Sequence, residues 1–86
     1  MTYSLAPEVS ATDTDDGGMV LLHEGTGRYW MLNRTGATVV RLLRAGSGTA
    51  EIAERLAAPF PEQRERVAAD VDALVASLVG ARLVTP

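Results

Sequence analysis

The sequence predicts an α+β fold in which a three-stranded antiparallel sheet comes first and three helices follow. Between residues 5 and 32, apolar and polar residues alternate, which is typical of strands, and Gly-rich turns interrupt the alternation. From residue 33 to about residue 79, the apolar residues recur at the spacing of a helix, with breaks at residues 46–48 and 59–61. Strands and helices therefore occupy separate halves of the chain.

The three strands are expected at residues 8–14, 19–23 and 28–32. Residues 16–18 (DGG) connect the first pair, and residues 25–27 (GTG) connect the second. Such short Gly-rich connections join neighbouring antiparallel strands, so the sheet is a simple meander.

The last strand has two different faces. Side-chain alternation places Arg28, Trp30 and Leu32 on one face, and Tyr29 and Met31 on the other. The pattern alone does not decide which of the two faces is buried.

The first two helices have recognisable start and stop signals. The first begins near Asn33 or Thr35, either of which can cap the free N–H groups of a first turn, and ends at Gly46. The second begins at Thr49 and has Glu51 in its first turn, where a negative charge is favourable. The residues expected to face the core are Val39, Val40 and Leu43 in the first helix, and Ile52, Ala53, Leu56 and Phe60 in the second.

The third helix is the longest. It begins with Pro61, which the first turn of a helix tolerates, and it ends at Gly80. At about 100° per residue, its core-facing stripe is expected to be Val67, Val71, Leu74 and Leu78. Asp70 and Gln63 border this stripe, so a partly apolar trough with charged edges beside the helix is a first candidate site.

The length of 86 residues allows one small core, so residues 1–86 are expected to form a single domain with residues 1–7 as a flexible N-terminus. The content of 47% apolar and 22% charged residues is typical of a compact globular protein. Residues 81–84 are short and apolar, and we expect them to pack back over the helices as a lid.

The composition also argues against several functions. With no Cys and one His, no disulfide, metal or other cofactor is expected, and no catalytic residue is assigned. Eight arginines, no lysine and a net charge of −3 make nucleic acid an unexpected partner. The sequence starts without a secretory signal and no apolar run reaches the roughly 20 residues of a membrane span, so we expect a cytoplasmic protein without membrane contact.

The two edges of the predicted sheet differ. Pro7 precedes the first strand, and Asp13, Asp15 and Asp16 lie at its end, where they discourage pairing with another chain. The strand at residues 28–32 contains no proline, lysine or acid, so its outer N–H and C=O groups can accept an extended peptide. The sequence is equally compatible with a loop or a second copy of the protein covering this edge.

Four segments resemble the PqqD-like family, whose members recognise leader peptides in pathways that make ribosomally synthesised and post-translationally modified peptides. They are residues 27–37, 40–46, 49–53 and 70–80, so the resemblance covers nearly the whole chain. A free-standing chain of this size is most similar to the leader-peptide-binding proteins of lasso-peptide biosynthesis.

The resemblance implies a winged-helix-like, non-catalytic protein on which the leader lies as an extra strand along residues 28–32 and against the third helix. The implied peptide-binding residues are Arg28, Tyr29, Trp30, Met31, Leu32, Val67, Asp70, Val71 and Leu74. Asp70 either holds a basic or donor group of the leader or is simply solvated. The implied partners are the precursor leader peptide, a leader peptidase and the macrolactam-forming cyclase of lasso pathways, to which the protein delivers the precursor.

Three alternatives remain beside this interpretation. A winged helix can bind DNA, but the third helix carries Glu65, Asp70 and Asp72 as well as arginines, whereas a groove-reading helix needs a positive surface. An enzyme with His23 as a base has no nucleophile or orienting partner nearby in the sequence. A dimerisation module would pair the open strand with its own copy.

Overall fold

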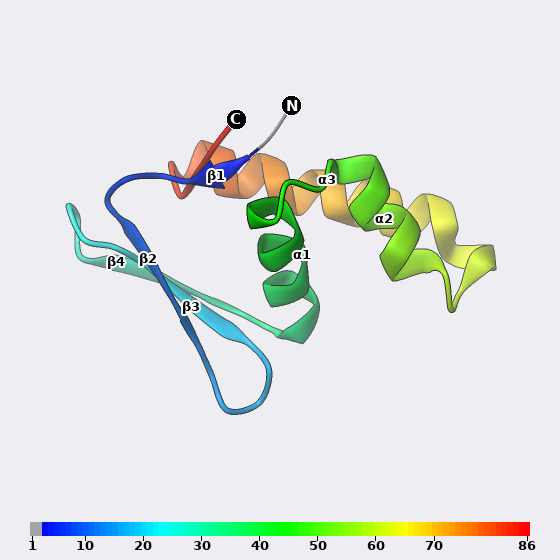
Figure 1. The fold of residues 1–86 in the computed structure, drawn as a ribbon, viewed down its shortest axis with the longest axis horizontal. Coiled ribbons are helices and arrows are strands. Elements are labelled where there is room, and N and C mark those ends of the chain that lie inside the picture. Colours follow the sequence, from blue (N-terminus) through cyan, green and yellow to red (C-terminus); the bar gives the residue numbers. More distant parts are fainter. Residues whose placement is uncertain (1–2) are drawn as a thin grey trace.

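A three-stranded sheet and three helices make up most of the fold (Figure 1). The computed structural model describes residues 3–86. The strands β2 (Val9–Asp13), β3 (Met19–His23) and β4 (Arg28–Leu32) pair antiparallel in the order β2-β3-β4. The helices α1 (Arg34–Arg44), α2 (Thr49–Ala57) and α3 (Arg64–Gly80) follow them. The predicted α+β fold is therefore confirmed, including the order of its elements.

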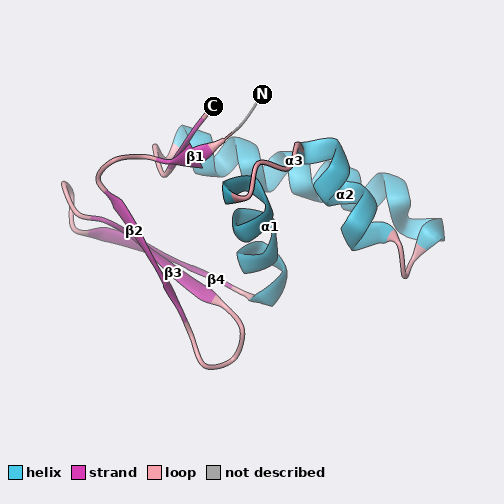
Figure 2. Cartoon of the chain, in the orientation of Figure 1, coloured by secondary structure: helices cyan, strands magenta, loops and turns pink. Residues whose placement is uncertain are grey.

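The helix ends follow local sequence signals, and Figure 2 shows the short loops between them. Asn33, not Thr35, caps α1, because its side-chain oxygen accepts a hydrogen bond of 2.9 Å from the N–H of Gly36. Gly46 follows α1 with a φ of +98°, a conformation that favours glycine. The short 3₁₀ helix η1 (Pro61–Gln63) leads into α3, so the proline signal marks the start of a tighter turn.

The two ends of the described chain form a second, smaller sheet, so Ser4 and Leu5 of the segment expected to be flexible, residues 1–7, are paired. β1 (Ser4–Leu5) pairs antiparallel with β5 (Val84–Thr85), while residues 1–2 lie outside the described part of the chain. The N–H of Ala6 also donates to the carbonyl oxygen of Leu83 at 3.0 Å. Leu83 is fully buried, so the tail packs back onto the core as expected, but as the partner of a strand.

The core has two adjoining parts. The first lies between the sheet, α1 and the end of α3, and contains Val9, Met19, Leu21, Ala37, Val40, Leu78, Leu83 and Val84. The second lies among the three helices and contains Val39, Leu43, Ile52, Ala53, Val71 and Val75. Because α1 contributes residues to both, it joins the sheet to the other two helices.

The register of the sheet determines which face of β4 is buried. The fully buried Leu21 of β3 lies opposite Trp30, whereas its neighbour Leu22 lies opposite Tyr29. Trp30 therefore packs against the core, and Tyr29 and Met31 lie on the outer face, 64% and 74% exposed. The ambiguity of the sequence pattern is resolved in favour of the face that carries Trp30.

The buried stripe of α3 differs from the predicted one. The helix buries Val71, Val75 and Leu78, while Val67 and Leu74 are only half-buried. At about 100° per residue, Val67 and Leu74 lie on the same flank of the helix, and Val75 lies on the opposite flank. The core therefore covers the helix on a line shifted toward Val75, and the flank with Val67 and Leu74 remains partly open.

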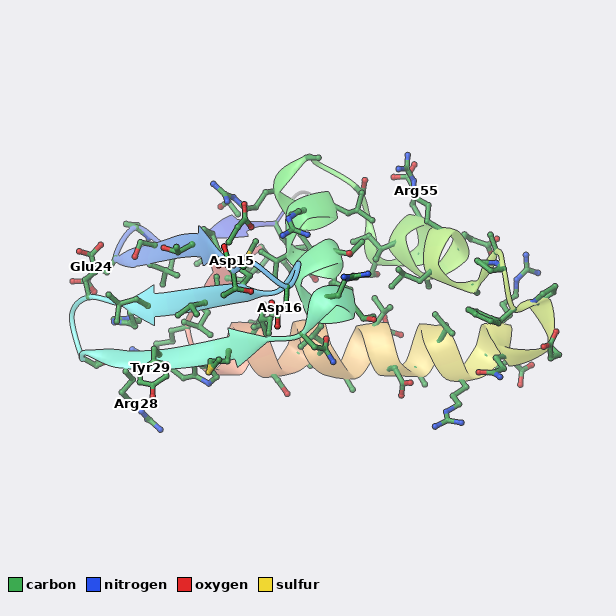
Figure 3. All side chains as sticks on the ribbon, turned by 90° about the horizontal axis from the view of Figure 1, so that it is seen from below. Asp15, Asp16, Glu24, Arg28, Tyr29 and Arg55 are labelled. Atoms are coloured by element: carbon green, nitrogen blue, oxygen red, sulfur yellow. The ribbon has the colours of Figure 1, made fainter. Side chains whose placement is uncertain are left out.

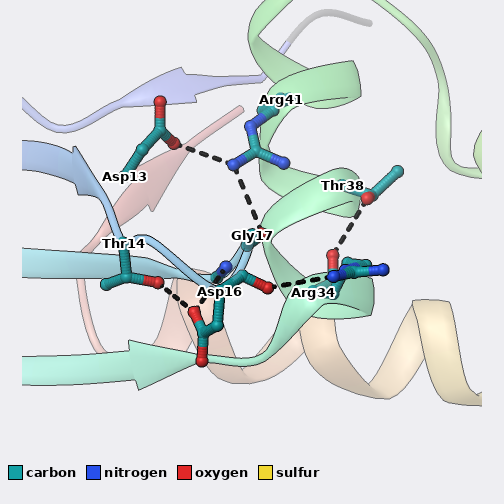
Figure 4. Close-up of polar contacts among 8 residues, drawn as sticks. Asp13, Thr14, Asp16, Gly17, Arg34, Thr38 and Arg41 are labelled. Carbon is teal, nitrogen blue, oxygen red and sulfur yellow. Dashed lines mark hydrogen bonds and ion pairs between the residues drawn. The ribbon is translucent and has the colours of Figure 1, made fainter.

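The turn between β2 and β3 is held by its own side chains (Figure 4). The carboxylate of Asp16 accepts hydrogen bonds from the hydroxyl of Thr14 and from the N–H of Gly18, the latter at 3.1 Å. These bonds, first that of Thr14, hold the pKa of Asp16 below its usual value of 3.8. A Cβ at Gly18 would lie 2.5 Å from the carbonyl oxygen of Leu32, so this turn approaches the end of β4 closely.

Two arginines of α1 attach that turn to the helix. Arg41 Nη2 lies 2.8 Å from Asp13 Oδ1, and Arg34 Nη2 donates to the backbone carbonyl oxygen of Asp16 at 3.2 Å (Figure 4). Each exposed contact of this kind is worth only about 0–1 kcal/mol. Together they hold the β2–β3 turn against α1.

Neighbouring leucines of β3 provide a matched test of this packing. Replacing Leu21, which is fully buried, with Ala should lower the free energy of unfolding by about 2–5 kcal/mol, because the change leaves a cavity in the core. Leu22→Ala on the outer face should cost less than about 1 kcal/mol. Urea unfolding followed by circular dichroism measures both, and equal losses would contradict the described faces.

The hydrogen bonds of Asp16 predict a pH dependence of stability. The folded protein lowers the pKa of the Asp16 carboxyl below 3.8. The stabilisation that the ionised carboxylate gives the fold is therefore fully present above pH 3.8, and it is lost as the pH falls through the folded-state pKa. The stability difference between the wild type and Asp16→Asn should therefore be larger at pH 6 than at pH 3. Urea unfolding at both pH values measures it, and a difference independent of pH would refute the linkage.

Candidate peptide-binding groove

β4 is an edge strand, and within residues 3–86 no strand pairs with its outer side. Figure 3 looks at the sheet from below, with β4 as the outermost strand and α3 extending along the same side of the molecule. Alternate residues of β4 therefore direct N–H and C=O groups away from β3. Such groups form a template onto which a further strand can bind.

A groove of about 700 Å³ opens between the end of β4 and the first part of α3. Its lining is mainly apolar and consists of Met31, Leu32, Asn33, Thr35, Gly36, Val39, Leu56, Phe60, Gln63, Val67, Asp70, Val71 and Leu74. An open, mostly apolar groove with a few polar groups is typical of a site that holds peptide side chains.

One wall of the groove is a single face of α3 with its preceding turn. Gln63, Val67, Asp70, Val71 and Leu74 follow one another at intervals of one, three or four positions and all line the groove. This is the partly open flank described above, so the helix residues that are left half-buried by the core face the groove. The groove corresponds to the trough that the sequence predicts beside this helix.

The sequence analysis did not assign the residues that α1 and the end of α2 contribute. Asn33 and Val39 come from the start of α1, and Leu56 and Phe60 come from α2 and the loop after it. Phe60 is 53% exposed, and an exposed aromatic residue at the rim of a groove is a usual anchor for a peptide. The contribution of α1 was partly predictable, because a helix that begins directly after β4 must have its first turn at the end of that strand.

Six of the nine predicted site residues line this groove. They are Met31, Leu32, Val67, Asp70, Val71 and Leu74. Arg28 and Trp30 instead border a smaller cavity at the other end of β4, and Tyr29 lies on the outer face of the sheet, lining neither. The predicted β4 residues are therefore spread along the whole strand and over both of its faces.

The ionisable groups near the groove are few. Asp70 is exposed and is the one ionisable residue in its lining, and within residues 3–86 no cation lies within 4.0 Å of its carboxylate. His23 is engaged elsewhere, because its Nδ1 accepts from the N–H of Thr26 at 3.3 Å and its Nε2 lies 4.0 Å from Glu8 Oε2. This arrangement suits binding through shape and backbone groups better than acid–base chemistry.

Between residues 3 and 86, no group of His, Cys, Asp or Glu side chains is arranged to hold a metal ion. In the same part of the chain, no helix has the length and apolar character to cross a membrane.

Solved structures similar to this chain include two complexes with leader peptides. One is a lasso peptide synthetase B1 complexed with the leader peptide, which is 37% identical, with 100% of both chains covered and a TM-score of 0.90. The other is TbiB1 in complex with the TbiA(beta) leader peptide, which is 28% identical, with 98% of this chain and 94% of that chain covered and a TM-score of 0.82.

No curated protein sequence matches the chain. A protein-family model does match it, and this match agrees with the two similar structures. The family model described as coenzyme PQQ synthesis protein D (PqqD) matches residues 18–84, which include β3, β4 and all three helices. The chain therefore belongs to the PqqD family.

Proposed function

We propose that this chain is a non-catalytic protein, a single domain over residues 1–86, that binds the leader region of a ribosomally made precursor peptide of the lasso class. The leader adds a strand to the free edge of β4 and packs against α3. The observation that carries this proposal is the unpaired edge of β4 beside a mainly apolar groove. The leader peptides present in both similar structures support it.

Main-chain hydrogen bonds alone do not supply enough affinity for this function. A Kd of about 1 μM corresponds to about −8.2 kcal/mol, while each hydrogen bond adds about 0.5–1.5 kcal/mol net, before the cost of ordering the peptide. Buried apolar surface adds about 25 cal/mol per Å². One or two apolar leader residues in the groove, beside Val67, Leu74 and Phe60, therefore provide much of the affinity and the selectivity.

A strand on this edge presents its side chains alternately to the two faces of the sheet. Every second leader residue faces the groove beside Leu32 and α3, and the residues between them lie beside Tyr29 and Met31 on the outer face. Tyr29 and Met31 are 64% and 74% exposed, so they can cover these residues without a change in the backbone. The leader motif should therefore repeat its apolar positions at intervals of two.

The proposal extends to the enzymes that act on the precursor. Among residues 3–86, the groove lining contains a single ionisable side chain, Asp70, and one carboxylate without an orienting partner does not assemble an active site. The chemistry therefore belongs to partner enzymes, a leader peptidase and the macrolactam-forming cyclase, to which this chain delivers the bound precursor.

A charge placed in the groove tests its role. Val67→Asp puts a carboxylate on the half-buried flank of α3, where apolar leader residues would bind, and should weaken binding at least about tenfold. Ala69→Asp is the matched control, because it adds the same charge to the same helix at an exposed position that does not line the groove. Fluorescence polarisation with a labelled leader peptide of a lasso precursor measures both.

The interpretation requires both variants to be folded, which circular dichroism and thermal unfolding establish. A tenfold loss in Val67→Asp with near wild-type binding in Ala69→Asp supports the groove. Equal affinities of the two folded variants would exclude this face of α3 as the leader site.

A further inference from the structure

A second cavity, which we call the cationic compartment, lies at the other end of β4. It measures about 390 Å³ and is lined by His23, Thr26, Arg28, Trp30, Gly80, Ala81 and Arg82. The start of β4 forms one side and the end of α3 forms the other. The compartment therefore continues the line along which a peptide on β4 would run, beyond the apolar groove.

Two arginine residues from different elements line this compartment. Arg28 comes from β4 and lies over the ring of Trp30, 5.6 Å from its centroid, and Arg82 follows α3. Within residues 3–86, no carboxylate lies within 4.0 Å of either guanidinium. Two like charges without an acidic partner at one cavity make a site for an anion.

The nearby acids of the chain are directed elsewhere. Glu8 shares a neighbouring cavity with Arg82, but its carboxylate lies 4.0 Å from His23. Glu24 points away from the β3–β4 hairpin on the side opposite to Arg28 (Figure 3). The charge of the compartment is therefore left for a ligand.

The backbone of Arg82 gives independent support. Arg82 has a φ of +62° and is the one non-glycine residue with a positive φ in the described chain, at the place after a helix where glycine is usual. The N–H of Leu83 donates to the carbonyl oxygen of Leu78 at 2.9 Å, so the turn itself needs only this backbone shape. A non-glycine residue in this conformation is uncommon, and this favours a role for the Arg82 side chain.

We propose that the cationic compartment binds a carboxylate side chain of the leader peptide, an inference that rests on the proposed function. Antiparallel pairing is the more stable arrangement for a strand added to β4, and it places the apolar leader residues first, near Met31, and later residues near Arg28. A strand rises about 3.3 Å per residue. The acidic residue of the leader should therefore lie about four positions after the last apolar leader residue that enters the groove. Asp70 lines the apolar groove, whereas Arg28 and Arg82 line the compartment, so opposite charges lie at separate places along the path and favour one direction of the leader.

The test combines a protein variant with a peptide variant. Arg82→Asn removes the charge and keeps a residue that tolerates positive φ, so its thermal unfolding should occur at or above the wild-type temperature. The control is Arg55→Asn, which removes the same charge from an exposed position on α2, distant from β4 (Figure 3). The probes are a fluorescein-labelled leader peptide of a lasso precursor and the same peptide with each Asp and Glu replaced by its amide.

Arg82→Asn should weaken binding of the acidic leader about three- to tenfold at low salt, and should bind the amide leader as the wild type does. Arg55→Asn should bind both peptides as the wild type does. Arg28→Gln should repeat the result of Arg82→Asn, because both arginines line the compartment.

Two outcomes would overturn the inference and leave the proposed function intact. One is an equal loss for the acidic and the amide leader in Arg82→Asn, which would assign Arg82 a purely structural role at the end of α3. The other is wild-type affinity of Arg82→Asn and Arg28→Gln for the acidic leader. Failure of the wild-type protein to bind the leader at all would instead refute the proposed function.

Discussion

In the part of the chain that the structure describes, residues 3–86, the backbone of β4 is paired on one side only, and the proposed function depends on this. The strand does not need its outer edge for stability, because Trp30 packs against the core and β3 pairs with it along its whole length. Unpaired backbone groups at an exposed edge are solvated at no great cost, and they bind a complementary strand without prior rearrangement. A rigid strand with one free edge therefore combines a stable fold with a preorganised binding surface.

The third helix completes this surface because its packing is asymmetric. The core covers α3 along Val71, Val75 and Leu78, which leaves Val67 and Leu74 on a partly open flank that faces the end of β4. The same helix ends beside the start of β4 in the cationic compartment. The helix α3 thus borders both the apolar groove and the cationic compartment along the path that a leader would follow. The length of α3 between them sets how far apart the two sites lie.

The sequence predicts the elements well because their signals are local. Gly-rich turns delimit the strands, and Asn33 and Pro61 mark helix starts. The pairing of β1 with β5 was not predictable, since two-residue strands about eighty positions apart show no periodic pattern. The outward position of Tyr29 and the groove contribution of Phe60 also escaped prediction, because the first depends on sheet register and the second on how α2 lies against α3. Local pattern gives the element, and long-range packing gives the face.

Amide hydrogen exchange of the chain, measured by NMR with and without a saturating leader peptide, tests strand addition most directly. If the leader pairs with β4, the amides of Arg28–Leu32 that face the free edge gain protection, and the outer amides of β2 at the opposite edge do not. Unchanged exchange along β4 in a saturated complex would mean that the leader binds elsewhere, and the account of the open strand would be wrong.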